Sequence, residues 1–193
     1  MEIEKYDSVV EKLKKALKHK RFVHTMGVAY TAAALAMRHG ADVDRALLAG
    51  LLHDCAKCFT DEEKLSLCAE GGIELSDVER ENTALIHAKL GPYIAARDYG
   101  VGDPEILDAI RTHTTGEPGM AILQQIVYIA DMIEPNREDN IPSMGLMREA
   151  AFADLDRGVA VISERMVRYL EESGSKRIDP ATLATYEYYK EKL

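Results

Sequence analysis

Four histidines and two aspartates interrupt stretches of sequence that otherwise have the apolar pattern of buried helices. His53 and Asp54 are adjacent, at the end of a mostly apolar run that begins near residue 46. An imidazole and a carboxylate are costly to bury without partners, and a metal ion would supply the partner that both need. The other members of the set interrupt similar apolar runs: His24, His87, His113 and Asp131.

The types of these six side chains indicate the metals and the reaction that they would serve. Six nitrogen and oxygen ligands without a thiolate are too many for one tetrahedral zinc ion, and they suit two first-row metals that share a carboxylate. Such a pair lowers the pKa of water from about 15.7 to about 7 and withdraws charge from phosphoryl oxygens. Such a pair could therefore support hydrolysis of a phosphoanhydride without a serine or cysteine nucleophile. Iron, manganese, cobalt and zinc are all compatible with it.

Each of these residues also has an ordinary structural interpretation. A single histidine on an apolar face is more often a core residue bonded to a backbone carbonyl, and a buried aspartate can cap a neighbouring helix. Six such positions in one chain make this interpretation much less favourable than a shared metal site. His19 and His39 lie in polar surroundings at expected helix ends, so we predict that both are surface residues.

Basic side chains near the six positions are candidates for binding phosphate. Lys57 follows Asp54 by three residues, so the two side chains share a face if the helix continues. Arg137 follows Asp131 beyond a proline, where its planar guanidinium group could bind a distal phosphate through two hydrogen bonds. From the residues alone, an ordinary solvated lysine after a helix end is an equally good interpretation of Lys57. If both basic side chains bind phosphate, Asp54, Lys57 and Arg137 form the catalytic set. Further candidates for substrate binding are Arg21, Arg111 and Thr114, and we expect no more than one of these two arginines to contribute.

Cys55 and Cys58 form a C-x-x-C pattern beside the His-Asp pair. This pattern can be redox-active or metal-binding in a cytosolic chain. A thioredoxin-like motif needs a βαβ context, and a zinc site needs a second pair of this kind. Both are missing, so we predict two small residues that pack beside the site.

Helix signals recur along the whole chain, and strand signals are almost absent. Ser8 and Glu11 form a possible capping box, and further boxes begin at Thr60 and Ser76. Gly91-Pro92 is expected to break or bend the chain. Apolar spacing predicts helices over about 22–39, 42–54, 103–113, 120–133 and 179–189, two more within 143–172, and a polar loop over 135–142. The pattern predicts one all-α domain over residues 1–193.

Composition and net charge indicate which binding partners and which cellular compartment to expect. The 193 residues include 24 Lys and Arg against 33 Asp and Glu, which gives a net charge of −9. An acidic chain is a poor binder of nucleic acid, although a pocket can still be locally cationic. No apolar run approaches the length of a membrane span. The charged first residues lack a signal-peptide pattern, and the cysteine count is odd, so we expect a cytoplasmic protein.

Five segments of the chain together resemble the HD-domain hydrolases of the YqeK type, which are bacterial symmetrical bis(5′-nucleosyl)-tetraphosphatases. The segments are RFVHT (21–25), LHDCAK (52–57), IHAKLG (86–91), RTHTTG (111–116) and IADMIEPNR (129–137). The last segment is the most specific, because His-Asp pairs alone define only the wider superfamily. The resemblance covers nearly the whole chain and implies a single-domain, HD-type helical bundle.

The resemblance further implies a di-iron centre, a homodimer, and cleavage of diadenosine tetraphosphate into two ADP by a hydroxide that bridges the metals. The ligands that it implies are His24, His53, Asp54 and Asp131 for one ion, and Asp54, His87 and His113 for the other, with Asp54 bridging. Two alternatives stay open. One is an HD-type di-iron oxygenase that acts on a small anionic substrate, and the other is a non-catalytic nucleotide sensor.

Overall fold

Helices are the regular secondary structure of the computed structural model, which describes residues 6–137, 143–174 and 178–193. No strand occurs within these ranges, so the predicted all-α fold is confirmed. Two short segments form 3₁₀ helices, which are η2 (Cys55–Cys58) and η3 (Lys190–Lys192). The α-helices are α1 (Asp7–Ala16), α2 (His19–His39), α3 (Val43–Leu52), α4 (Asp61–Glu70), α5 (Asp77–Glu81), α6 (Ile86–Tyr99), α7 (Pro104–Thr112), α8 (Ile122–Ile133), α9 (Met144–Ala153), α10 (Leu155–Glu172) and α11 (Pro180–Tyr189).

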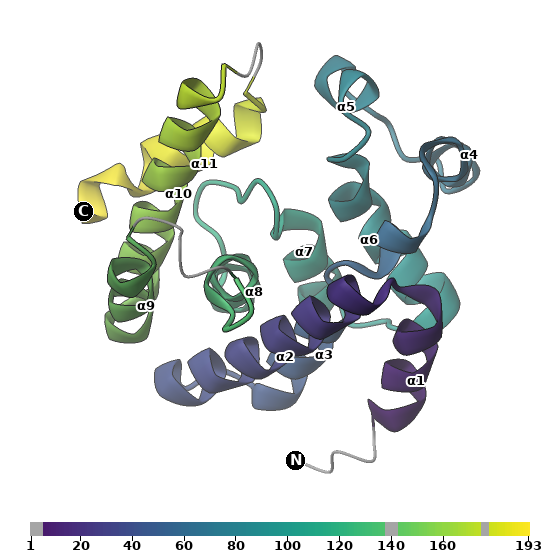
Figure 1. The fold of residues 1–193 in the computed structure, drawn as a ribbon, viewed down its shortest axis with the longest axis horizontal. Coiled ribbons are helices and arrows are strands. Elements are labelled where there is room, and N and C mark those ends of the chain that lie inside the picture. Colours follow the sequence, from purple (N-terminus) through teal and green to yellow (C-terminus); the bar gives the residue numbers. More distant parts are fainter. Residues whose placement is uncertain (1–5, 138–142, 175–177) are drawn as a thin grey trace.

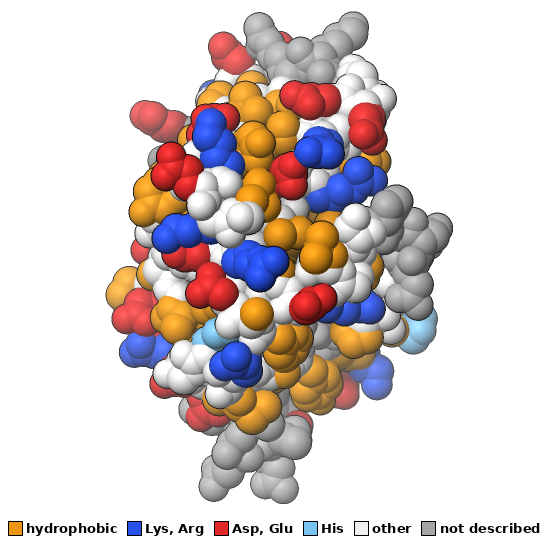
Figure 2. Space-filling view, turned by 90° about the vertical axis from the view of Figure 1, so that its left-hand side faces the viewer, with side chains coloured by type: hydrophobic (Ala, Val, Ile, Leu, Met, Phe, Trp, Pro, Cys, Tyr) orange, Lys and Arg blue, Asp and Glu red, His pale blue; other side chains and the backbone are white. Residues whose placement is uncertain are grey.

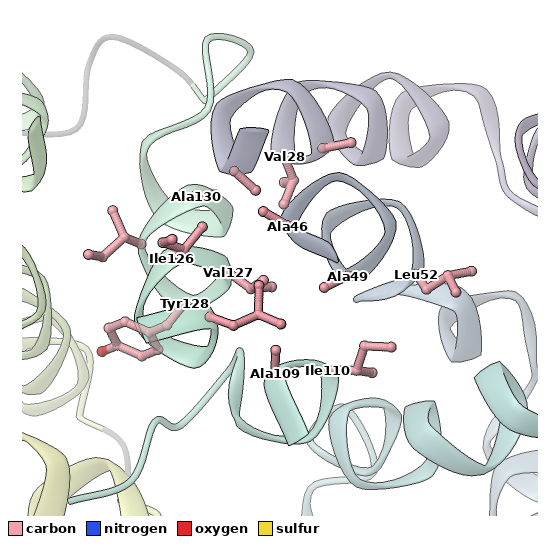
Figure 3. Close-up of a cluster of buried hydrophobic side chains, with 14 of the residues drawn as sticks. Val28, Ala46, Ala49, Leu52, Ala109, Ile110, Ile126, Val127, Tyr128 and Ala130 are labelled. Carbon is pink, nitrogen blue, oxygen red and sulfur yellow. The ribbon is translucent and has the colours of Figure 1, made fainter. Parts of the chain in front are cut away.

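Four helices, α2, α3, α7 and α8, enclose the buried apolar cluster shown in Figure 3. Val28 from α2 and Leu52 from α3 are fully buried in it, as are Ile110 from α7 and Val127 from α8. Complete burial of one such side chain stabilises the fold by about 1.5–3 kcal/mol. The cluster therefore fixes the four helices relative to one another, and each of them carries a predicted metal ligand at or near one end.

The remaining helices surround this core on two sides. In Figure 1, α8 lies between the pair formed by α2 and α3 and the pair formed by α9 and α10. The last helix, α11, packs on α10. On the opposite side, α6 packs on α7, and α4 packs on α6.

Local capping signals explain most of the helix boundaries. Thr60 and Ser76 each accept a hydrogen bond from the backbone N–H three residues later and form complete capping boxes. The predicted box at Ser8 is wrong, because α1 begins at Asp7 and its N-cap is Tyr6, which offers no side-chain cap. Tyr6 is buried against the core, so packing of the aromatic ring fixes this boundary. The predicted loop 135–142 lies partly outside the described residues.

Of the break or bend expected at Gly91-Pro92, the break is wrong, because α6 continues through Pro92 from Ile86 to Tyr99. Proline inside a helix removes one backbone hydrogen bond and costs about 3 kcal/mol. Close packing of α6 on α7 offsets this cost. A Cβ atom at Gly91 would lie 2.6 Å from Cγ2 of Ile110, so the helices approach each other where the glycine leaves room.

The surface carries charges of both signs. Figure 2 shows the side on which α9, α10 and α11 lie, and acidic and basic side chains are interspersed there with hydrophobic ones. No helix in the described part of the chain combines the length and the hydrophobicity that crossing a membrane requires.

Candidate metal centre

The six predicted ligands meet in one place, which we call the His-Asp cluster. His24 lies within α2, and His53 and Asp54 directly follow α3. His87 lies at the start of α6, and His113 directly follows α7. Asp131 lies in the last turn of α8. All four histidines are buried, and the side chain of Asp131 is 20% exposed.

Asp54 stands at the centre of the cluster and is almost completely buried. Its Oδ2 atom lies 3.3 Å from Nε2 of His53 and 4.0 Å from Nε2 of His24. Its Oδ1 atom lies 3.3 Å from Nε2 of His87 and 3.6 Å from Nε2 of His113. Each carboxylate oxygen thus faces its own pair of imidazoles, which is the arrangement that a bridging carboxylate needs.

Asp131 completes the half of the cluster that contains His24 and His53. Its Oδ1 atom lies 3.0 Å from Nε2 of His24 and 3.9 Å from Nε2 of His53. In the other half, Nε2 of His87 and Nε2 of His113 lie 3.1 Å apart. Two ligands held at right angles, each about 2.1 Å from one ion, lie about 3 Å apart. The spacing of both halves is therefore close to that of a metal site.

Three of the imidazoles are oriented by the backbone. Nδ1 of His53, His87 and His113 lies 2.7, 2.5 and 2.7 Å, respectively, from the carbonyl oxygen three residues earlier. A carbonyl only accepts, so Nδ1 carries the proton in each ring. In the neutral form of each ring, Nε2 is then a lone-pair donor that points into the cluster.

Polar atoms without hydrogen-bond partners inside the cluster indicate that it can bind a cation. Nε2 of His24, Nε2 of His53 and Oδ1 of Asp54 are buried and form no hydrogen bond of acceptable geometry with any residue that the structure describes. Each unsatisfied buried group costs about 1–3 kcal/mol. A positive ion among them would satisfy all three at once, so the residues present fit a metal.

The protonation states also suit metal ligation. Burial lowers the pKa of His87 well below its usual value, and the neighbouring His113 lowers it further, so the ring stays neutral near pH 7. Burial alone would raise the pKa of Asp54. The surrounding imidazoles, His53 above all, outweigh this effect and hold the pKa of Asp54 well below its usual value. Near pH 7 the Asp54 carboxylate is therefore anionic, and the ring of His87 is neutral.

Two arginines bind the carboxylates of the cluster. Nη1 of Arg21 donates to Oδ2 of Asp54 at 2.7 Å, and Nη2 of Arg137 donates to Oδ1 of Asp131 at 2.7 Å. The third arginine candidate points elsewhere, because the Arg111 guanidinium forms ion pairs with acidic residues of α7 and of the following loop. The structure thus brings Arg21 and Arg137 to the cluster, and Arg111 lies apart from it.

Lys57 and Thr114 lie beside the cluster in different ways. Lys57 belongs to the 3₁₀ helix η2, in which side chains three residues apart are eclipsed, so it shares a side with Asp54. Burial lowers the pKa of Lys57, and the Asp54 carboxylate opposes that shift. Oγ1 of Thr114 lies 3.2 Å from Nε2 of His87 and 3.0 Å from Nε2 of His113. Thr114 therefore reaches the second half of the cluster through its hydroxyl group.

A cavity of about 670 Å³ opens next to the cluster, and we call it the basic cleft. Its volume is within the usual range for small-molecule sites. The lining residues are Lys18, His19, Lys20, Arg21, Val23, His24, Glu134, Asn136 and Arg137. Our sequence interpretation missed Lys18 and Lys20, although four consecutive basic or histidine residues just before a ligand were a readable signal.

An apolar cavity of about 630 Å³ adjoins the basic cleft and shares Val23 and Asn136 with it. Phe22, Met26 and Tyr30 of α2 line the cavity on one side. Residues of α9 and of the segment that follows α8 line the other side. A cationic cleft and an apolar cavity thus lie side by side along α2.

The two histidines outside the cluster behave differently from each other. His19 is exposed, as predicted, although it lines the basic cleft. His39 is half-buried, and its Nε2 lies 2.8 Å from the carbonyl oxygen of Ala151 on α9. His39 is thus partly exposed, because the end of α2 packs against α9.

The cysteines form no disulfide, and we expect unequal reactivity from the three thiols. Cys55 and Cys68 are buried, whereas Cys58 is exposed. Burial raises the pKa of all three thiols, so little thiolate is present near pH 7. With Ellman's reagent at pH 8, we expect one thiol per native chain to react, more slowly than free cysteine, and three thiols per chain in denaturant. Rapid reaction of two thiols in the native protein would contradict this prediction.

Comparisons with known proteins agree with this geometry. The family model described as "HD domain" matches residues 21–136, which include all six members of the cluster. A symmetrical bis(5′-nucleosyl)-tetraphosphatase of Bacillus subtilis is 38% identical over 91% of this chain and 92% of its own length. The protein of the same name from Halalkalibacterium halodurans is 36% identical over 90% of this chain and 91% of its own length. A crystal structure from Clostridium acetobutylicum, described as a predicted HD superfamily hydrolase involved in NAD metabolism, matches with a TM-score of 0.91. That structure is 34% identical, and the match covers 97% of this chain and 98% of the other.

Proposed function

The chain belongs to the HD domain family, and we propose that it is a metal-dependent hydrolase that cleaves diadenosine tetraphosphate into two ADP. The observation that carries the proposal is the Asp54 carboxylate, whose two oxygens each face a separate pair of imidazoles. The names of the relatives at 33–38% identity support the same substrate.

The cluster would hold two metal ions. One set of ligands is His24, His53, Asp54 and Asp131, and the other is Asp54, His87 and His113. Two bound ions supply an acidic water molecule and withdraw charge from phosphoryl oxygens. We propose iron for both positions, in keeping with the family resemblance, and the nitrogen and oxygen ligands are compatible with this choice.

The cations of the basic cleft would bind and orient the polyphosphate. Arg21 and Arg137 lie within hydrogen-bond distance of the two cluster carboxylates, so their guanidinium groups flank the place where a scissile phosphate would sit. Lys57 adds positive charge from the side of η2. Planar guanidinium groups can form two parallel hydrogen bonds to phosphate oxygens. The chain is acidic overall, but the cleft is locally cationic.

The adjoining apolar cavity would receive one nucleoside. Phe22, Met26 and Tyr30 supply apolar and aromatic surface there, whereas the basic cleft supplies the charge. A nucleotide has the same division between an apolar base and an anionic chain. We therefore propose that the substrate lies along α2, with a base in the apolar cavity and the phosphates at the cluster.

Product analysis tests the proposal directly. Protein purified without oxygen should convert diadenosine tetraphosphate into ADP alone, and a chelator should stop the reaction. AMP together with ATP among the products would contradict symmetrical cleavage. A requirement for oxygen would favour the HD-type oxygenase instead. Tight binding of ADP by metal-loaded protein, without turnover of any dinucleoside polyphosphate, would favour a nucleotide sensor.

Three further proposals concern the setting of the enzyme. We propose a homodimer, which sedimentation at micromolar concentration would test. We propose that the protein acts in the cytoplasm, where free thiols such as those of Cys55, Cys58 and Cys68 persist. We also propose that it does not bind nucleic acid, in keeping with its net charge of −9.

A further inference from the structure

Glu134 has a buried carboxylate, directly follows α8, and contacts the His-Asp cluster at the Nδ1 side of the His24 ring. Only 1% of the residue is exposed. Its Oε1 atom lies 3.0 Å from Nδ1 of His24. Its Oε2 atom accepts two hydrogen bonds from Asn136, from the backbone N–H at 2.7 Å and from Nδ2 at 2.9 Å. Both carboxylate oxygens of Glu134 therefore face nitrogen atoms.

His24 is the only histidine of the cluster with a carboxylate at Nδ1. The rings of His53, His87 and His113 lie at helix ends, where a carbonyl three residues earlier accepts the Nδ1 proton. His24 lies inside α2, where backbone carbonyls accept hydrogen bonds from the helix itself. Its ring therefore needs an acceptor from another part of the chain, and Glu134 is positioned to be that acceptor.

We propose that Glu134 is a positioning residue that keeps the proton of His24 on Nδ1, so that Nε2 is free to bind a metal ion. Asn136 fixes the orientation of Glu134 through its two N–H donors. The inference rests on the proposed function, because it assigns His24 as a metal ligand. Carboxylates that orient ligand histidines also raise the basicity of the ring.

The chain makes room for this carboxylate at Gly27, one turn after His24 on α2. A Cβ atom at Gly27 would lie 2.1 Å from Oε2 of Glu134 and 2.9 Å from Nδ2 of Asn136. An alanine at position 27 would therefore push the Glu134 carboxylate out of its place. The close approach of α2 and Glu134 depends on a position without a side chain.

The substitution Glu134→Gln tests the proposal with almost no change in shape. The Gln side chain has one oxygen and one NH₂ group in place of two oxygens. Its oxygen must accept from Asn136, because two N–H donors converge on that position. The NH₂ group must then face Nδ1 of His24, so Nδ1 becomes the acceptor and the proton moves to Nε2. A ring protonated at Nε2 cannot bind a metal through that atom.

The first measurement is the ¹⁵N spectrum of the histidine rings in metal-free protein, which reports for each ring nitrogen whether it carries a proton. Wild type should show a proton on Nδ1 of His24, which faces Glu134, and the Glu134→Gln variant should show Nδ1 without a proton and Nε2 with one. The rings of His53 and His113 should keep the proton on Nδ1 in both proteins, and they serve as internal controls. A purely structural role for Glu134 would not move the proton on one ring alone.

The second measurement is the affinity for Mn²⁺, by titration calorimetry. Loss of the partner of a ligand histidine typically lowers metal affinity about 10–100-fold, and we expect the Glu134→Gln variant to lie in that range. Gly27→Ala should weaken Mn²⁺ binding in the same direction while Glu134 is retained, and it replaces the first variant if that one does not fold. Glu164→Gln on the surface of α10 is the matched control and should bind as wild type does.

An unchanged His24 tautomer in the Glu134→Gln variant, with Mn²⁺ affinity equal to that of wild type, would overturn the inference. This outcome is separate from failure of the proposed function. If wild type bound no metal or did not hydrolyse diadenosine tetraphosphate, the proposed function would fail. The tautomer measurement on metal-free protein would still report whether Glu134 holds the His24 proton.

Discussion

The variant Asp54→Asn is expected to lose both metal ions and all measurable hydrolysis while keeping its fold. Asn has one oxygen in place of two and no negative charge, so it cannot face two pairs of imidazoles with an anionic oxygen each. Loss of a partner of one ligand typically lowers metal affinity or activity about 10–100-fold. Loss of the bridging carboxylate itself should exceed about 100-fold. Metal analysis by mass spectrometry and turnover of diadenosine tetraphosphate measure the two effects.

The matched control for this variant is Asp103→Asn. Asp103 caps α7 by accepting a hydrogen bond from the backbone N–H of Glu105. Asparagine caps helices as well as aspartate does, so metal content and turnover should stay at the level of wild type. Circular dichroism should show both variants folded. Turnover retained by metal-free Asp54→Asn protein would show that the reaction does not depend on the His-Asp cluster.

The ligand set was readable from the sequence for a physical reason. Polar residues that interrupt apolar helices need partners, and His53 with Asp54 at the end of α3 is the clearest case. The sequence also indicated the helix ends that carry His53 and His113. Such ends provide free carbonyls, and these carbonyls accept the Nδ1 protons of both rings.

Glu134 could not be found in the same way. It follows an apolar helix and precedes Pro135, Asn136 and Arg137, so by pattern it belongs to a solvated polar loop. Its burial depends on α2, which is more than 100 residues earlier in the chain. Gly27 of α2 was a distant signal, and a glycine inside a helix does not indicate which side chain fills the space.

Pro92 shows where prediction of the fold from local sequence fails. A proline after a glycine normally ends a helix, but α6 continues through both residues because it packs against Ile110 of α7. Burial of apolar surface between distant helices can outweigh a local penalty of about 3 kcal/mol. Local propensity therefore predicted the wrong boundary where a tertiary contact decides.

Gly50→Ala is expected to destabilise the protein by about 1–3 kcal/mol, although alanine favours helix formation more than glycine does. A Cβ atom at Gly50 in α3 would lie 2.7 Å from Cα of Ala29 and 3.1 Å from its backbone nitrogen in α2. Backbone atoms cannot rotate away, so α2 and α3 must separate. The steric cost should therefore outweigh the propensity gain of about 1 kcal/mol. Urea unfolding of metal-free protein measures the difference.

Gly145→Ala in α9 is the matched control, because no atom of the described residues lies within 4 Å of a Cβ atom at that position. Only the propensity gain applies there, so this variant should be as stable as wild type or up to about 1 kcal/mol more stable. Gly50→Ala should also bind Mn²⁺ more weakly, since α2 carries His24 and α3 leads into His53 and Asp54. Equal stability of the two alanine variants would mean that close contact between α2 and α3 is not required. The geometry of the His-Asp cluster would then have to depend on other packing.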